Sequence, residues 1–238
     1  MAITSAPVPE TLLLIPPSGV ASRLPSGSVT CLSGDGKTYA YVTQERPDAL
    51  PQVLFVVDVA SGKVRLKAVH EFSAALKSDE ESQIFRLALS EDGSFCVSVS
   101  GLSIAGWKTG VEEPLWVLPG SPRWVGIRGG EAYFASRDSL TRVDLKAGHV
   151  IEQASFPLSP VAILDDGRLL CASYDKLKLA EFGGQSEDVY QHAEPIKTVV
   201  LGPNAQVVVA GKDTPLAVVV DWEKKTVLQE YDLSALPD

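Results

Sequence analysis

The sequence is poor in the residues that many structural and catalytic sites require. Its only asparagine is Asn204, and because Ala-Gln follows it, the chain contains no N-glycosylation sequon. Cys31, Cys96 and Cys171 are too few and too scattered for a disulfide framework, and each lies in an apolar, strand-like run. We therefore expect buried free thiols, which fits a reducing compartment.

Long hydrophobic runs and positive charge are also scarce. The apolar stretch Thr11–Ile15 is too short for the core of a signal peptide or for a membrane span. Lysine and arginine number 21 against 30 aspartates and glutamates, which gives a formal net charge of -9. This acidity disfavours direct binding of nucleic acids and of anionic membranes. We expect a soluble, intracellular protein of the cytoplasm or nucleus without membrane contact.

The motifs of common enzyme and metal-binding classes are missing. The sequence has no G-x-S-x-G nucleophile elbow, no P-loop and no dinucleotide fingerprint. It has neither C-x-x-C nor H-x-x-x-H spacing, and its Asp-Gly turns lack the alternating acidic ligands of calcium loops. We predict no metal site, no cofactor and no catalytic residues.

What the sequence does contain is a repeat. A turn residue recurs at Gly93, Gly130, Gly167 and Asn204, in steps of 37 residues, and Gly36 begins the series 57 residues before Gly93. A fixed period of this size, with strand-like sequence on both sides of each turn, indicates that one supersecondary unit is repeated.

Each unit contains four short strands. In the unit around Gly167 we predict strands at 160–164, 168–173, 176–180 and 188–190, with turn signals between them. Runs such as Val207-Val208-Val209 hardly alternate, as expected for a sheet covered on both faces by neighbouring sheets. A β-sandwich is the structural alternative, but it predicts no constant register.

We therefore predict an all-β fold, a β-propeller of about five four-stranded blades that form a small or incomplete ring. The whole chain, 1–238, is expected to be a single domain. The predicted blades are residues 28–72, 83–119, 122–157, 159–192 and 195–233.

Three segments interrupt the repeat. Insertions at 44–52 and 71–82 lengthen two loops, which we interpret as solvated variation or as carriers of function. The strand Thr11–Ile15 lies outside the five units. It is expected either to close the last blade, which would hide an exposed sheet edge, or to pair elsewhere.

The fifth unit carries further recognisable features. His192 precedes the first strand, the turn is Pro203-Asn204, Asp213 follows the second strand, and Val220-Asp221-Trp222 ends the third. This order resembles divergent WD repeats, a propeller family whose rings typically have seven blades. The resemblance implies that His192 and Asp213 form a structural pair, and that Asp138 and Asp175, at the position of Asp213, are structural as well.

Cations occupy a recurring position, seven residues before the turn residue, at Arg86, Arg123 and Lys197. In a propeller these strand starts surround one mouth of the central channel, and the loops after the second strands reach the same face. Those loops contribute Arg137, Lys176 and Lys212, with the aromatic side chains of Trp124 and Tyr174 nearby. We predict either a binding face for an acidic peptide or other anionic group, or a set of structural ion pairs with Asp138, Asp175 and Asp213.

The functional prediction is a non-catalytic scaffold that docks a protein partner on this channel-mouth face or along an open blade edge. Two alternatives stay open. One is a hydrolase or small-ligand binder that uses the central channel. The other is an accessory subunit of an RNA-processing or ribosome-assembly complex.

Overall fold

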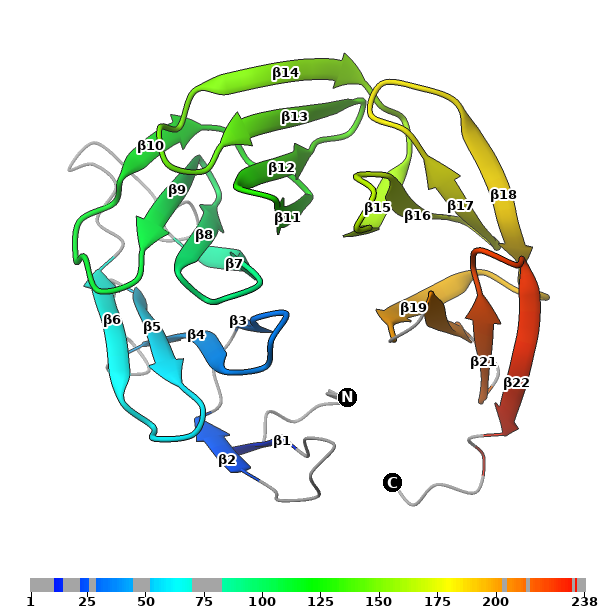
Figure 1. The fold of residues 1–238 in the computed structure, drawn as a ribbon, viewed down its shortest axis with the longest axis horizontal. Coiled ribbons are helices and arrows are strands. Elements are labelled where there is room, and N and C mark those ends of the chain that lie inside the picture. The colour runs from blue at the N-terminus through cyan, green and yellow to red at the C-terminus, as the bar shows by residue number, and fades with distance from the viewer. Residues whose placement is uncertain are drawn as a thin grey trace. The chain divides into compact units, whose positions relative to one another are not determined.

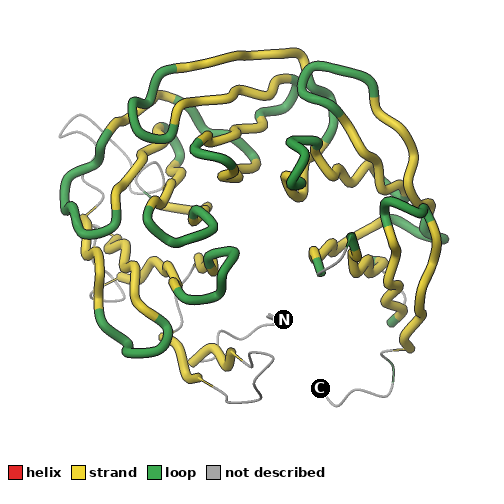
Figure 2. The backbone as a smooth tube through the Cα atoms, in the orientation of Figure 1, coloured by secondary structure: helices red, strands yellow, loops and turns green. Residues whose placement is uncertain are grey.

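The computed structural model describes residues 11–14, 22–25, 29–44, 52–69, 83–202, 205–212, 215–232 and 234. These residues form strands joined by loops and turns, with no helix among them (Figure 2). In the described part of the chain there is accordingly no helix that could cross a membrane.

Five four-stranded antiparallel sheets carry most of the described chain, and in each the strands follow one another in chain order (Figure 1). Blade 1 consists of β3 (Val29–Leu32), β4 (Thr38–Gln44), β5 (Gln52–Asp58) and β6 (Val64–Val69). Blade 2 consists of β7 (Ile84–Leu89), β8 (Phe95–Ser100), β9 (Ser103–Lys108) and β10 (Trp116–Pro119).

The remaining three blades have the same order. Blade 3 consists of β11 (Trp124–Arg128), β12 (Glu131–Ala135), β13 (Ser139–Asp144) and β14 (Val150–Ser155). Blade 4 consists of β15 (Ser159–Ile163), β16 (Leu169–Ser173), β17 (Lys176–Ala180) and β18 (Ser186–Gln191). Blade 5 consists of β19 (Ile196–Leu201), β20 (Gln206–Gly211), β21 (Leu216–Asp221) and β22 (Thr226–Asp232). The prediction of five four-stranded units is confirmed.

The leftover N-terminal strand does not close blade 5. β1 (Thr11–Leu14) instead pairs with β2 (Ser22–Pro25) in a two-stranded antiparallel sheet, and blade 5 has its own outer strand, β22. The second of the two expectations for this strand, pairing elsewhere, is therefore the correct one. Both predicted loop insertions fall largely outside the described residues.

Contacts divide the chain into two compact units. Unit 1 contains Met1–Ser136 and Thr141–Glu152, and unit 2 contains Arg137–Leu140 and Gln153–Asp238. We describe the two units separately, and the organisation as one domain stays a prediction.

The turn between the first two strands of blade 2 is held by a side-chain network. Ser90 Oγ donates to Asp92 Oδ1 at 2.8 Å and accepts the Phe95 N–H at 3.0 Å. Asp92 Oδ1 also accepts the Ser94 N–H at 3.0 Å and the Ser94 hydroxyl at 2.7 Å. These bonds to Ser94 and Ser90 favour the carboxylate and lower the pKa of Asp92 to about 2.

The equivalent turn of blade 1 repeats this arrangement 57 residues earlier. Ser33 Oγ donates to Asp35 Oδ1 at 2.7 Å and accepts the Thr38 N–H at 2.9 Å. The Lys37 N–H donates to Asp35 Oδ1 at 3.0 Å, and this bond is the main cause of the lowered pKa of Asp35. The turn residues Gly36 and Gly93 therefore correspond to a recurring set of bonds in blades 1 and 2.

Replacing Asp92 by asparagine should lower the free energy of unfolding at pH 7 by about 1 kcal/mol, a value discounted because the side chain is exposed. The folded-state pKa of about 2 lies below the ordinary 3.8, so the carboxylate stabilises the fold above about pH 4 and this contribution is lost as the pH falls toward 2. Urea denaturation at several pH values should show wild type and Asp92→Asn converging near pH 2. A difference that persists unchanged at pH 2 would contradict a role for the charged form.

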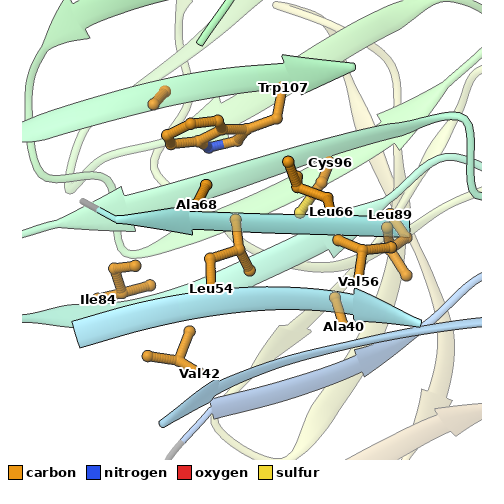
Figure 3. Packing of buried hydrophobic residues seen from close by; sticks show 11 residues of the cluster. Ala40, Val42, Leu54, Val56, Leu66, Ala68, Ile84, Leu89, Cys96 and Trp107 are labelled. Atoms are coloured by element: carbon orange, nitrogen blue, oxygen red, sulfur yellow. The ribbon is translucent and has the colours of Figure 1, made fainter. Parts of the chain in front are cut away.

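The core of unit 1 lies between consecutive blades. Blades 1 and 2 share a cluster of buried apolar side chains, shown in Figure 3. In it Leu54 and Ile84 are almost fully buried, and the Trp107 ring is 2% exposed. The indole N–H of Trp107 donates to Ser98 Oγ at 2.8 Å, so the one polar group of this side chain is satisfied. Trp107 is therefore a core residue.

Blades 2 and 3 meet at Trp116, which is 8% exposed. Its indole N–H donates to the Leu145 carbonyl at 2.9 Å. A Cβ atom added to Gly106 would lie 2.1 Å from the ring, and one added to Gly148 would lie 2.4 Å from it. The lack of side chains at these two glycines leaves the space in which the indole packs, and Trp116 is a core residue.

Unit 2 has a core of its own between blades 4 and 5. Leu170, Leu177 and Leu179 of blade 4 pack in one cluster with valines of blade 5, among them Val207 and Val209, which are fully buried. The valine between them, Val208, is only half-buried. The expectation that both faces of this run are covered is therefore wrong for the described residues, since β20 is buried on one face only.

Candidate functional site

In unit 1, the predicted binding residues lie at the starts of two innermost strands that are packed side by side, β7 and β11. Arg86 is in β7 and is exposed, with its guanidinium carbon 5.7 Å from the centroid of the Phe85 ring. Arg123 directly precedes β11 and is exposed, and its N–H donates to the Ala135 carbonyl at 2.8 Å. Trp124, the first residue of β11, is half-buried. Among the described residues, neither arginine has an ion-pair partner.

In unit 2, the site is built on the turn between β16 and β17. Ser173 and Lys176 are paired across this hairpin, which leaves Tyr174 and Asp175 as the two turn residues. Tyr174 has a φ of 54° and is 77% exposed. A positive φ is uncommon for an aromatic residue, and here it holds the ring at the tip of a rigid hairpin.

The first strand of blade 5 is attached to this turn. The Ile196 N–H donates to the Tyr174 carbonyl at 2.7 Å. This bond joins the start of β19 to the turn that carries the exposed ring. Lys197 and Lys212 are both exposed, and among the described residues neither has an ion-pair partner.

Lys176 is in a different situation, because its charge is already paired. Its ammonium lies 2.5 Å from Asp188 Oδ2, and the ammonium of Lys178 lies 2.6 Å from Oδ1 of the same carboxylate. The bond to Asp188 raises the pKa of Lys176, and the two lysines lower the pKa of Asp188 to about 2. Asp188 is the acceptor that the sequence analysis missed, and no spacing rule in the repeat pointed to it.

Arg137 lies in the turn after β12 and is exposed, without an ion-pair partner in the part of the chain that the structure describes. Lys176 is thus paired with Asp188, which is not one of the aspartates that the sequence analysis named as partners. A single channel-mouth face that unites all these residues stays a prediction.

Asp138 and Asp175 are the two described aspartates with a predicted structural role, and the main-chain carbonyl of each accepts a hydrogen bond. The Phe156 N–H donates to the Asp138 carbonyl at 3.0 Å, and the His192 N–H donates to the Asp175 carbonyl at 2.7 Å. In both blades the residue that follows the outer strand is thereby tied to the turn between the second and third strands. The Asp175 carboxylate also accepts a bond of 3.1 Å from the Gln191 side-chain amide.

His192 is 3% exposed. Its Nδ1 lies 2.9 Å from the Tyr190 hydroxyl, and its Nε2 lies 4.0 Å from Glu194 Oε1. Asp213, the predicted partner of His192, lies outside the described residues, so their pairing stays a prediction.

The three cysteines are free, with Cys96 and Cys171 buried and Cys31 half-buried. Burial raises the pKa of Cys31 and of Cys171 to about 12 and also raises that of Cys96. The nucleophilic thiolate is therefore disfavoured at all three positions. In the described part of the chain, no group of three His, Cys, Asp or Glu side chains could hold a metal ion.

Comparison with known proteins identifies the fold. No family model matches the sequence, and no curated protein matches it either. The structure, in contrast, superposes on propellers at low sequence identity. Hsv2 of Kluyveromyces lactis matches with a TM-score of 0.63 and 12% identity, over 86% of this chain and 63% of that one.

Two WD40 domains match equally well. The WD40 repeats of RRP9 give a TM-score of 0.62 at 16% identity, over 86% of this chain and 63% of that one. The C-terminal WD40 domain of Sif2 gives 0.60 at 15% identity, over 95% of this chain and 67% of that one. This chain thus spans about two thirds of the length of the structures that it matches. The predicted resemblance is confirmed at the level of fold: the chain is an all-β protein with the β-propeller fold of the WD-repeat proteins.

Proposed function

We propose that the protein is a non-catalytic scaffold that docks a protein partner, and that its exposed cations and Tyr174 bind an acidic segment of that partner. A chain of the mitotic checkpoint complex is among the structural matches, with a TM-score of 0.61 and 15% identity. That match supports a role in protein assemblies by analogy of fold.

One observation carries the proposal. In a protein of net charge -9, five cations at the predicted positions are exposed and have no ion-pair partner among the described residues: Arg86, Arg123, Arg137, Lys197 and Lys212. Exposed cations of this kind attract carboxylates, and an exposed aromatic side chain supplies apolar contact at little entropic cost. Tyr174 is such a side chain in unit 2.

The experiment uses a fluorescently labelled, glutamate-rich peptide as a probe and measures fluorescence anisotropy at low and physiological salt. Arg86→Glu/Arg123→Glu should weaken binding by about tenfold, because two attractive contacts become repulsive. Lys63→Glu/Lys146→Glu, two charge reversals at exposed turns of unit 1, is the control matched in net charge and should change affinity little. Equal effects of the two variants would show that only net charge matters and would contradict the proposed site.

Tyr174→Gly separates binding from folding in unit 2. Glycine adopts a positive φ without strain, so the hairpin should keep or gain stability while the exposed ring is lost. Peptide affinity should fall while the urea midpoint does not. Unchanged affinity would remove Tyr174 from the site.

A further inference from the structure

Each blade has two faces, and blade 1 shows how they are used. On β4 and β5, Ala40, Val42, Leu54 and Val56 point toward blade 2 and belong to the cluster that the two blades share. We call the face toward the following blade the forward face. The opposite, backward face of blade 1 carries Tyr39, Tyr41, Phe55 and Val57.

In blades 1 and 2 the forward-face residues of the second strand stand four and six residues after the turn residue. In blade 1 these are Ala40 and Val42, and in blade 2 they are Val97 and Val99. All four have 0% exposure, and each pair packs in a cluster that includes residues of the next blade. In these two blades, therefore, the forward face of the second strand is covered by a neighbouring sheet.

In blade 5 the second strand alternates between its two faces. Val207 and Val209 belong to the cluster shared with blade 4, so Val208 and Ala210 lie on the opposite, forward face, where both are half-buried. Val208 pairs directly with Val219 and Ala210 with Ala217, so the apolar positions continue across two strands. The core cluster of unit 2 contains the backward-face valines of blade 5 and none of these residues. We call Val200, Val208, Ala210, Ala217 and Val219 the forward face of blade 5.

The pattern of blade contacts indicates what fits this face. Within the two units, a forward face packs on a backward face where blade 1 meets blade 2, where blade 2 meets blade 3, and where blade 4 meets blade 5. A second copy of the chain could offer the backward face of its blade 1, but Tyr39, Tyr41 and Val57 on that face are 1%, 9% and 3% exposed. That face is already closed, and its rings are stacked on one another.

We propose that the forward face of blade 5 docks an antiparallel β-sheet of a partner protein, which packs on it as a further blade would. The face of the docking sheet resembles the backward face of a blade, with apolar residues at alternate positions of two adjacent central strands. The proposal rests on the scaffold function proposed above, names a second surface for it, and makes no use of the cationic residues.

The face can be made polar without disturbing the strands. In Val208→Lys/Val219→Glu, opposite charges lie directly across the two strands, an arrangement that antiparallel sheets favour. The urea midpoint of the isolated chain should shift little. The matched control is Val207→Lys/Val220→Glu, the neighbouring cross-strand pair on the backward face, which is 0% exposed and should abolish folding of unit 2. Equal loss of stability in both variants would mean that the chain covers the face itself, and would overturn the proposal.

Docking is tested with a photo-cross-linking residue in place of Ala210, in the full chain expressed in its native cells. We expect adducts that map to apolar strand positions of a β-sheet in another protein, and a yield at least tenfold lower when Val208→Lys/Val219→Glu is added. The same residue in place of Val227, which is 45% exposed on the outer strand, should give no such adduct. Adducts with a second copy of this chain, an absence of adducts, or a yield unaffected by the double variant would each overturn the proposal.

The proposed cationic site and the proposed docking of a sheet on blade 5 can be tested independently of each other. Arg86→Glu/Arg123→Glu should leave the Ala210 adduct unchanged, because the arginines lie in unit 1 and the forward face of blade 5 lies in unit 2. Loss of peptide binding with retention of the adduct, or the reverse, therefore identifies which surface is in use.

Discussion

Gly93→Ala should lower the free energy of unfolding of unit 1 by about 3 kcal/mol. Gly93 has a φ of 66°, where a side chain costs about 1–2 kcal/mol. An added Cβ would also lie 2.3 Å from the Thr38 Cβ of blade 1, and such overpacking costs about 1–3 kcal/mol more. Urea denaturation followed by tryptophan fluorescence measures the effect.

Gly36→Ala is the matched control for this prediction. Gly36 occupies the equivalent turn of blade 1 with a φ of 70°, but an added Cβ would meet no atom within 4 Å. Only the backbone cost of about 1–2 kcal/mol should remain. The difference between the two variants isolates the contact between blades 1 and 2, and equal losses would show that this contact is looser than described.

Trp116→Ala should have the largest effect of any single substitution considered, a loss of about 3–5 kcal/mol. Removing a buried indole leaves a cavity between blades 2 and 3, and it leaves the Leu145 carbonyl without its 2.9 Å hydrogen bond. Gly106 and Gly148, which border this space, have no side chains that could fill it.

Two controls divide this loss into its parts. Trp116→Phe keeps a ring in the space but cannot donate the hydrogen bond, so about 1–2 kcal/mol should be lost. Val117→Ala alters the next residue, which is 46% exposed, and should change stability by less than about 0.5 kcal/mol. A Trp116→Ala variant as stable as Val117→Ala would mean that the indole does not hold the two blades together.

The repeat made the blades predictable because its turn residues impose backbone geometry. Gly93 and Gly167 have positive φ values in the structure, as the Asp-Gly hairpin signal requires. The pairing of β1 with β2 was less predictable. An isolated strand such as 11–14 carries no mark of its partner in its own residues, because sheet pairing depends on a second segment, here Ser22–Pro25.

The candidate site was predictable only in part. The positions of Arg86, Arg123 and Lys197 follow from the register, and their exposure agrees with it. The pairing of Lys176 with Asp188 does not follow, because it depends on the bulge in β17–β18 pairing between Leu177 and Lys178. A local shift of register of this kind changes which side chains meet and leaves no signature in the repeat.

The main-chain bonds to Asp138 and Asp175 have a consequence for how this protein can vary. The bonds from Phe156 and His192 go to the main-chain carbonyl oxygen at these turns, and every amino acid supplies one. Substitutions there leave the tie between outer strand and turn in place. Mutation can therefore introduce new side chains at these turns without loss of the tie, and selection for a new partner can act on these positions.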